Sequence, residues 1–161
     1  MNNEIDDLHV KHEKRKHKQS KQGLSYKDQN PSSVFDIYWI YAHCTDCSYP
    51  ESTENSGKWL IFVPNEEIDE KWRIIKKATE EGLLGRSSKV STMKKSPIAK
   101  NSKEKVICVY TYNWKDETDV IKVRNVLTKL GFDQILVYKT DEDTMKGKYS
   151  WKGDQIVKFR I

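Results

Sequence analysis

Long apolar runs are absent from this sequence, and the longest ones, such as Trp59 to Val63, have only the length of a strand. A transmembrane helix needs about 20 mainly apolar residues, so we expect no membrane-spanning segment. A secretory signal needs an apolar run of about 7 to 15 residues after the first methionine, and none follows Met1. These two absences predict a cytoplasmic protein.

Cysteine is scarce, with Cys44, Cys47 and Cys108 in 161 residues. That number agrees with a reducing compartment better than with a disulfide scaffold. Cys44 and Cys47 form a C-x-x-C segment, which would hold zinc only if two further ligands came from elsewhere, and no second pair with matching spacing exists. Cys108 lies in an apolar segment and is expected in the core. We therefore expect neither a metal nor a cofactor.

Familiar catalytic motifs are also missing from the sequence. Nothing in it resembles a Walker phosphate loop, the nucleophile elbow of hydrolases or a zinc-hydrolase motif. No internal repeat is present either. A hydrolase or transferase of another kind that acts on a nucleotide stays open.

Charge is abundant, with 33% charged residues, 36% apolar residues and a net charge of +5. Residues 1–32 combine many cations with few apolar residues and no periodicity, which predicts a disordered basic tail. Residues 33–161 are then one domain, long enough to bury a core. The basic run from His9 to Lys21 could contact nucleic acid weakly or be a solvated tail, and it has no interleaved aromatic residues.

The hydrophobic pattern of the domain alternates between strands and helices. One helix is predicted from Asn65, as the N-cap, to Gly82, and a second over 118–130. Strands are predicted over 34–41, 58–63, 88–92, 106–112, 134–139 and 155–161, and loops over 44–57 and 93–105. Residues 140–153 are expected to form a loop or an irregular hairpin. Few helices among many strands favour an α+β fold with one curved, mainly antiparallel sheet and helices packed on one face. A doubly wound parallel sheet is the second choice.

The segment 82–92 is the first candidate for a ligand site. Its two glycines bend the chain, and Arg86, Ser88 and Lys89 offer the donors that a phosphate or another anion needs. The alternative is that Gly82 only caps a helix and that the strand after it carries polar residues on its solvent face. Strand alternation lets Lys89 point away from the helix-covered core.

Four segments of the chain together resemble one family in their order and spacing: 57–63, 84–91, 106–111 and 137–141. Over about residues 36–149 the sequence is similar to the largely uncharacterised family of the basophilic leukaemia-expressed protein, a domain of unknown function. The resemblance implies a fold like that of the translation initiation factor 4E superfamily. In that superfamily, helices back a curved antiparallel sheet, which agrees with the predicted order of elements.

Cap-binding members of that superfamily hold a methylated guanine between two tryptophans and bind its phosphates with Lys or Arg. In this chain Trp59 and Trp72 lie on apolar faces and are expected in the core, whereas Trp114 and Trp151 lie in polar surroundings and can meet a ligand. The resemblance and the cation cluster together favour binding of a phosphate-bearing ligand, with a nucleotide as the first candidate. The expected ligand-binding residues are Lys58, Arg86, Ser88, Lys89, Trp114 and Lys139.

Some relatives of this family have been labelled phosphothreonine lyases, so the resemblance also implies an enzyme acting on a phosphopeptide. Such an elimination needs a base, an acid and cations around the phosphate. Lys89 is the candidate base, with Lys58, Arg86 and Lys139 on the phosphate. Those lyases use a histidine shortly after a strand lysine, and the matching Lys58-Trp59-Leu60 has none. A non-catalytic protein-interaction domain that docks an acidic partner is the third alternative.

Overall fold

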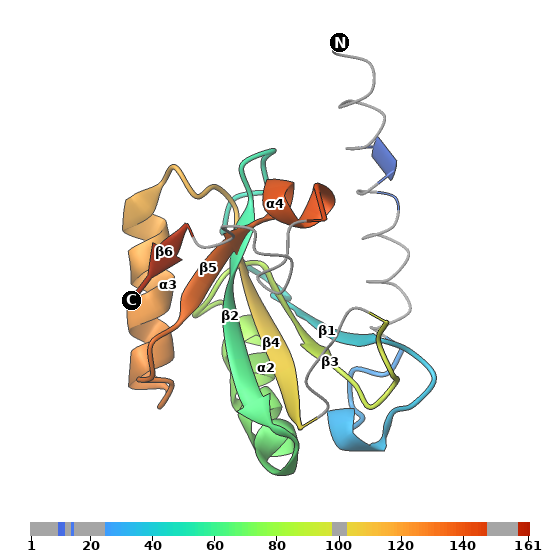
Figure 1. Cartoon of the computed structure of the whole chain (residues 1–161). Helices are drawn as coiled ribbons and strands as arrows, with labels where there is room; N and C mark the ends of the chain where they lie inside the picture. The colour runs from blue at the N-terminus through green and yellow to red at the C-terminus, as the bar shows by residue number, and fades with distance from the viewer. Residues whose placement is uncertain (1–9, 12–13, 15–24, 98–102, 148–157) are drawn as a thin grey trace.

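A six-stranded sheet with helices behind it makes up the domain in the computed structural model, which describes residues 10–11, 14, 25–97, 103–147 and 158–161 (Figure 1). The strand order is β1-β3-β4-β2-β5-β6, and every described strand pair is antiparallel. The strands are β1 (Trp39–His43), β2 (Gly57–Pro64), β3 (Ser87–Ser91), β4 (Glu104–Thr111), β5 (Val137–Thr140) and β6 (Phe159–Arg160). The helices are η1 (Pro31–Ser33), η2 (Asn65–Glu67), α2 (Ile68–Glu80), α3 (Glu117–Lys129) and α4 (Asp141–Met145).

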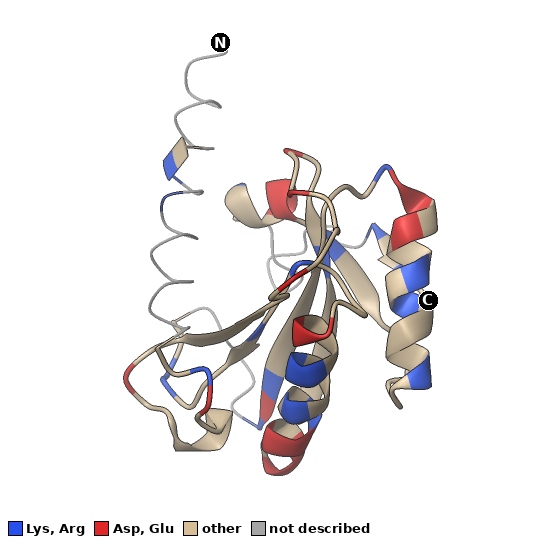
Figure 2. Ribbon diagram, turned by 180° about the vertical axis from the view of Figure 1, so that it is seen from behind, with Lys and Arg blue, Asp and Glu red and all other residues tan. Residues whose placement is uncertain are grey.

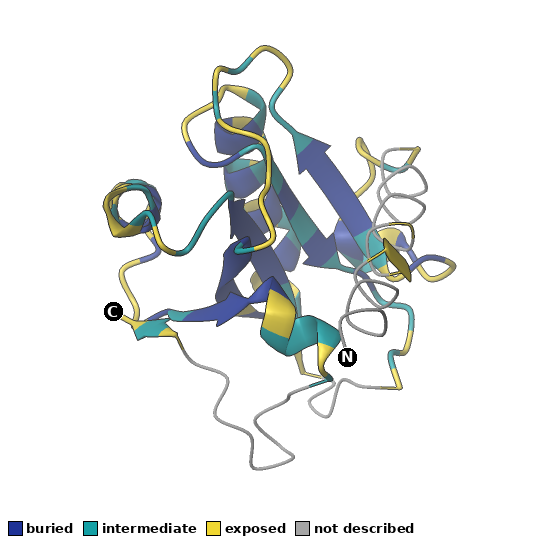
Figure 3. Ribbon diagram, turned by 90° about the horizontal axis from the view of Figure 1, so that it is seen from above, coloured by how far each residue is buried: buried dark blue, intermediate teal, exposed yellow. Residues whose placement is uncertain are grey.

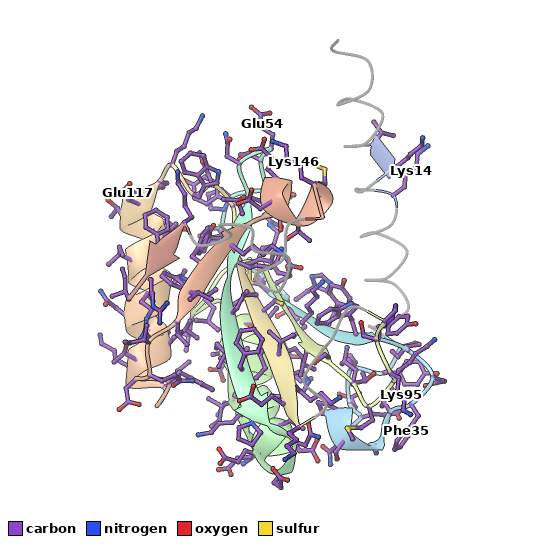
Figure 4. All side chains as sticks on the ribbon, in the orientation of Figure 1. Lys14, Phe35, Glu54, Lys95, Glu117 and Lys146 are labelled. Atoms are coloured by element: carbon purple, nitrogen blue, oxygen red, sulfur yellow. A yellow bond between two sulfur atoms is a disulfide. The ribbon has the colours of Figure 1, made fainter. Side chains whose placement is uncertain are left out.

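The main core lies between the sheet and the two long helices, α2 and α3, and side chains fill this space (Figure 4). In β2 the alternate residues Trp59, Ile61 and Val63 are buried toward the helices. The indole nitrogen of Trp59 donates a hydrogen bond to the carbonyl of Val120 in α3 at 3.1 Å. The short helix α4 lies on the other side of the sheet, next to β5 (Figures 1 and 3).

Glycines end both long helices, as the sequence predicts. Gly82 has a φ of 75° and Gly131 a φ of 97°, a backbone region that other residues rarely adopt. At the start of α3, the side chain of Asp116 accepts a hydrogen bond from the backbone N–H of Asp119, so Asp116 is the N-cap. The predicted antiparallel sheet, with its two long helices on one face, is confirmed.

Several predicted element boundaries are wrong, among them that of β5, which begins at Val137 and not at residue 134. The first strand begins at Trp39 and not at residue 34, because only two backbone bonds join residues 34–38 to residues 92–93. Asn65 begins the 3-10 helix η2 and is not the N-cap of α2, which is Glu67, and the backbone N–H of Asn65 donates to the carbonyl of Lys103. The predicted loop from residue 140 contains α4, whose N-cap Thr140 accepts from the N–H of Asp143.

Two of the three cysteines lie together. The sulfurs of Cys44 and Cys47 are in contact. The segment joining them is short enough that the two sulfurs meet across a single turn at the end of β1. Cys108 is a free thiol and is buried, as predicted. Among the described residues there is no group of three or more His, Cys, Asp and Glu side chains that could hold a metal ion.

Part of the predicted tail contacts the domain. Tyr26 packs against the main core and donates a hydrogen bond to the carboxylate of Asp36. The backbone N–H and the hydroxyl of Ser32 both donate to the carboxylate of Asp69 in α2. Most of residues 1–24 lie outside the described residues. In the part of the chain that the structure does describe, no helix has both the length and the apolar character needed to cross a membrane.

Arg124 in α3 is buried, and its guanidinium joins the helix to the segment before β5 and to the residue after β6. It donates to the carbonyls of Phe132, Gln134 and Ile161 at 3.0, 2.8 and 3.0 Å. A lysine ammonium cannot reproduce this planar fork. We expect Arg124→Lys to lower the free energy of unfolding by about 3 kcal/mol, because at least one carbonyl loses a charged donor. Urea unfolding measures this.

The control for that experiment is Arg73→Lys in α2, where the side chain is exposed. An exposed substitution of this kind changes the free energy of unfolding by less than about 0.5 kcal/mol. Equal stability of the two variants would contradict the role assigned to Arg124.

Candidate ligand-binding site

Strand alternation places three lysines from three strands on the face of the sheet opposite α2 and α3. Lys58 of β2 is directly opposite Lys139 of β5 and Tyr110 of β4. Lys89 of β3 is directly opposite Cys108 of β4, two residues from Tyr110. Residues directly paired across antiparallel strands share a face. We call this surface the lysine face and define it by Tyr41, Lys58, Lys89, Cys108, Tyr110 and Lys139.

Acidic side chains are concentrated elsewhere. Figure 2 shows Asp and Glu mainly on the helices and loops, whereas lysines interrupt the strands of the sheet. One carboxylate that contacts the lysine face is that of Asp141, at the start of α4. Its Oδ1 lies 2.6 Å from the ammonium of Lys58, and its Oδ2 accepts a hydrogen bond from Ser56 at 2.6 Å. Lys58 also donates to the hydroxyl of Thr144 at 2.9 Å.

Lys58 and Lys139 are both buried, with exposed fractions of 5% and 4%. Burial and the neighbouring ammonium of Lys58 lower the pKa of Lys139 to about 8. The carboxylates of Asp143 and Asp141 act in the opposite direction, because they favour the charged amine. Lys58 is therefore held in an ion pair with Asp141, while the Lys139 ammonium loses its proton at a lower pH than an ordinary lysine does.

The ammonium of Lys89 is surrounded by aromatic rings. It lies 3.9 Å from the ring centroid of Trp39, 5.9 Å from that of Tyr41 and 5.8 Å from that of Tyr110. The ammonium of Lys58 lies 5.4 Å from the same Tyr110 ring. Ring faces attract a cation at these distances, so the rings hold Lys89 in place. Tyr110 therefore connects two of the lysines.

Tyr41 places a buried hydroxyl on the lysine face. The residue is 5% exposed, and its hydroxyl oxygen has no hydrogen-bond partner among the residues that the structure describes. Burial, together with the Cys108 thiol and the Asp141 carboxylate, raises the pKa of Tyr41, so the phenol keeps its proton. An unpaired buried hydroxyl costs stability. A ligand with an acceptor oxygen would satisfy it.

Three of the six predicted ligand-binding residues are brought together, namely Lys58, Lys89 and Lys139. The other three lie elsewhere. Ser88 is fully buried on the helix side of the sheet, where its hydroxyl is 2.7 Å from that of Thr79 in α2. Neighbouring strand residues point to opposite faces, so Ser88 and Lys89 do not line the same surface.

Arg86 and Trp114 are also away from the lysine face. One guanidinium nitrogen of Arg86 donates to the carbonyl of Tyr49 at 2.6 Å, and another lies 3.3 Å from the carboxylate of Glu51. Trp114 packs against the main core, with the ammonium of Lys158 3.9 Å from its ring centroid. Trp151 lies outside the described residues.

Four residues of the site were missed by the reasoning from sequence: Trp39, Tyr41, Tyr110 and Asp141. Alternation along the predicted strand 34–41 places Trp39 and Tyr41 on one face. Nothing in the local pattern indicates that this strand pairs with residues 87–91. Tyr110 alternates with Cys108, which was expected in the core. Asp141 follows a predicted strand, and the sequence predicts a loop at this position.

The six-stranded antiparallel sheet with long helices on one face is a fold that this chain shares with solved structures of translation initiation factor 4E. Residues 6–144 match the model of the family described as "Basophilic leukemia-expressed protein Bles03". The chain belongs to this family, which confirms the resemblance of the four segments.

Solved structures agree on the fold. The crystal structure of schistosome eIF4E with m7GpppA and 4E-BP is 13% identical with a TM-score of 0.61, over 87% of this chain and 79% of that one. The complex of C. elegans eIF4E-3 with the 4E-binding protein Mextli and a cap analog is 16% identical with a TM-score of 0.56, over 88% of this chain and 80% of that one. At such low identity these matches show that the fold is shared and nothing more. The chemistry of the site follows from this chain's own residues.

Proposed function

We propose that the domain binds a phosphate-bearing ligand, with a nucleotide as the first candidate, on the lysine face. The observation that supports this is the convergence of Lys58, Lys89 and Lys139 from three different strands on one face. Ammonium groups only donate hydrogen bonds, and phosphate oxygens only accept them at neutral pH. Two neighbouring buried lysines repel one another, and an anion between them would relieve the repulsion.

The site residues would have different roles in ligand binding, which depend on how far each side chain is buried. Lys89 and Trp39 are half-buried and are the parts of the site that a ligand in solution can reach first. The hydroxyl of Tyr41 would donate to a phosphate oxygen, since it has no other partner. Asp141 holds the ammonium of Lys58 in a fixed position. A fixed donor loses little entropy when a ligand arrives.

A nucleotide, rather than phosphate alone, fits the aromatic residues beside the lysines. Base stacking on an aromatic side chain contributes about 1 to 3 kcal/mol. Trp39, which is half-buried, offers such a surface next to the Lys89 ammonium. The schistosome protein was solved with m7GpppA and the C. elegans protein with a cap analog, so related folds hold nucleotides in those proteins.

Lys89→Gln tests the proposal, because it keeps the length and polarity of the side chain and removes the charge. Losing one charged hydrogen bond costs about 1.5 to 3 kcal/mol, so we expect the affinity for ATP and for pyrophosphate to fall about 10-fold to 100-fold. Isothermal titration calorimetry at low salt measures both ligands.

Lys71→Gln is the matched control for Lys89→Gln. The Lys71 ammonium also sits over an aromatic ring, 5.5 Å from the centroid of Phe132, but it belongs to α2 on the opposite side of the sheet. Lys71→Gln should keep the wild-type affinity. The proposed site is wrong if Lys89→Gln binds both ligands as tightly as Lys71→Gln does.

A second candidate function is phosphothreonine elimination with Lys89 as the base, and the position of His43 favours it. His43 stacks on Tyr41 with 6.1 Å between ring centroids, so an imidazole lies at the edge of the lysine face. Burial lowers the pKa of His43, which reduces its supply of protons for a leaving oxygen. Mass spectrometry of a phosphothreonine peptide incubated with the protein decides the matter, and an unchanged peptide mass removes this candidate.

A further inference from the structure

Cys44 and Cys47 lie in one turn directly after β1, and their sulfurs face one another. The two Cα atoms are 5.8 Å apart, which is within the range that a disulfide requires. A bond between the two sulfurs therefore needs no movement of the backbone. Both cysteines are half-buried, whereas Cys108 is buried in the sheet. A thiol reagent in solution can thus reach the pair before it reaches Cys108.

A purely structural disulfide would contribute little at this position. The stabilisation from a cross-link grows with the length of the loop that it closes, because a longer loop has more freedom to lose in the unfolded chain. Cys44 and Cys47 are three residues apart, so the loop between them is very short. Structural cysteines are buried and inert, and reactive ones are partly exposed. Loop length and exposure both favour a reactive pair.

The turn that carries the two cysteines is fixed by contacts with its neighbours. The backbone N–H of Cys44 donates to the carbonyl of Arg86, just before β3, at 2.9 Å. The hydroxyl of Thr45 donates to the carbonyl of Glu80, the last residue of α2, at 3.3 Å. Gly82 leaves room beside the pair, since a β-carbon at this position would lie 3.5 Å from the Sγ of Cys44. These contacts hold the turn in place without any bond between the sulfurs.

We propose that Cys44 and Cys47 form a reversible dithiol–disulfide pair, which exchanges with a low-molecular-weight disulfide of the glutathione class. The C-x-x-C spacing is that of cysteines that undergo thiol–disulfide exchange. In a reducing compartment, which the sequence predicts, disulfides are transient and serve catalysis or redox sensing. Neither cysteine belongs to the lysine face, so the proposal stands or falls independently of phosphate binding.

The exchange balances with glutathione disulfide as the oxidant. The thiolate of one cysteine attacks a sulfur of glutathione disulfide, a mixed disulfide forms, and the first glutathione leaves as a thiolate. The thiolate of the other cysteine then attacks the protein sulfur of the mixed disulfide. The bond between Cys44 and Cys47 forms, and the second glutathione leaves as a thiolate. The two cysteines give up two electrons and two protons, and one glutathione disulfide becomes two molecules of glutathione.

A redox titration of the full chain tests the proposal. The chain is equilibrated without oxygen in buffers that hold glutathione and glutathione disulfide at a series of ratios. Acid then stops the exchange, and alkylation with peptide mass mapping locates the free thiols. We expect Cys44 and Cys47 to pass from dithiol to disulfide along the series, with the same curve from a reduced and from an oxidised sample. Cys108 is the internal control and should stay a thiol throughout, because it is buried.

Three results of this titration would overturn the proposal. A pair that stays a dithiol in glutathione disulfide alone does not form the bond. A pair that stays a disulfide in glutathione alone is a permanent structural bond. Oxidation of Cys108 to the same extent as Cys44 and Cys47 would show that the reaction does not depend on their place in the fold.

Single substitutions test the second step of the exchange. Cys47→Ser removes the thiol that completes the reaction, so Cys44 should stop at the mixed disulfide with glutathione, and Cys44→Ser should trap Cys47 in the same way. A neighbouring thiol acts at an effective concentration of millimolar or more, so we expect at least about tenfold less mixed disulfide in the wild type than in either variant. Ser48→Ala, an exposed position beside the pair, is the control and should behave like the wild type. Equal amounts of mixed disulfide in all four proteins would contradict exchange within the pair.

Discussion

Asp141→Ala is expected to lower the free energy of unfolding by about 3 to 5 kcal/mol, because it leaves a buried charge without its partner. The carboxylate of Asp141 is 2.6 Å from the ammonium of Lys58, and both side chains are 6% exposed. The same carboxylate accepts a hydrogen bond from the hydroxyl of Ser56, so Asp141→Ala also leaves this buried hydroxyl without its acceptor. Urea unfolding followed by circular dichroism measures the loss.

The neighbouring residue in the same short helix provides the control for Asp141→Ala. Glu142 lies 2.5 Å from Lys146, but both side chains are about half exposed, at 52% and 55%. Exposed ion pairs contribute about 0 to 1 kcal/mol, so Glu142→Ala should leave the stability almost unchanged. Similar losses in the two variants would show that Asp141 does not compensate a buried cation.

A double substitution asks whether Asp141 is needed for the fold itself or only for Lys58. Lys58→Met combined with Asp141→Leu removes both charges and keeps apolar volume. Replacing a buried ion pair by apolar residues is often neutral or stabilising. We expect the double variant to recover most of the stability lost in Asp141→Ala, while it loses affinity for pyrophosphate. This outcome would assign the pair to binding rather than to stability.

Trp59→Ala is the second substitution with a large expected effect, a loss of about 3 to 5 kcal/mol in the free energy of unfolding. Trp59 is fully buried and meets the ring of Tyr138 edge-on with 5.3 Å between centroids. Its indole nitrogen donates to the carbonyl of Val120, which joins β2 to α3. The alanine variant would leave a cavity and an unpaired carbonyl. Thermal unfolding monitored by circular dichroism would show the lower midpoint.

Trp39→Ala is the matched substitution on the other side of the sheet. Trp39 is half-buried and contacts the ammonium of Lys89 rather than the main core. We expect it to cost much less stability than Trp59→Ala and to weaken nucleotide binding, because Lys89 loses the ring that holds it. A larger stability loss for Trp39→Ala than for Trp59→Ala would contradict the assignment of Trp59 to the main core and of Trp39 to the opposite side of the sheet.

The sequence predicted the layers of the fold because local signals determine them. Gly82 and Gly131 end the two long helices where the pattern of apolar residues ends. Alternation in β2 separates Trp59, toward the helices, from Lys58, on the other face. Short-range periodicity and turn chemistry carry this information, so it can be read without knowing which strands pair.

The site was predicted only in part because it depends on pairing between distant strands. Lys89 meets Tyr41 through β1–β3 pairing and Cys108 through β3–β4 pairing, and neither pairing follows from local pattern. Asp141 reaches Lys58 because a short helix starts directly after β5. The prediction that Ser88 and Lys89 bind the same ligand is inconsistent with strand alternation. Ser88 and Lys89 are neighbours in a strand, and alternation excludes that both line one face.

The most direct test of phosphate binding on the lysine face is an NMR titration of the chain, labelled with ¹³C at the lysine side chains, with ATP. Lys→Arg variants assign the ε-methylene signals one at a time. We predict that the signals of Lys58, Lys89 and Lys139 shift together with one dissociation constant, while those of Lys71 and Lys77 in α2 stay in place. Shifts confined to lysines outside this set, or no shifts at saturating ATP, would contradict the assignment of the lysine face as the binding site.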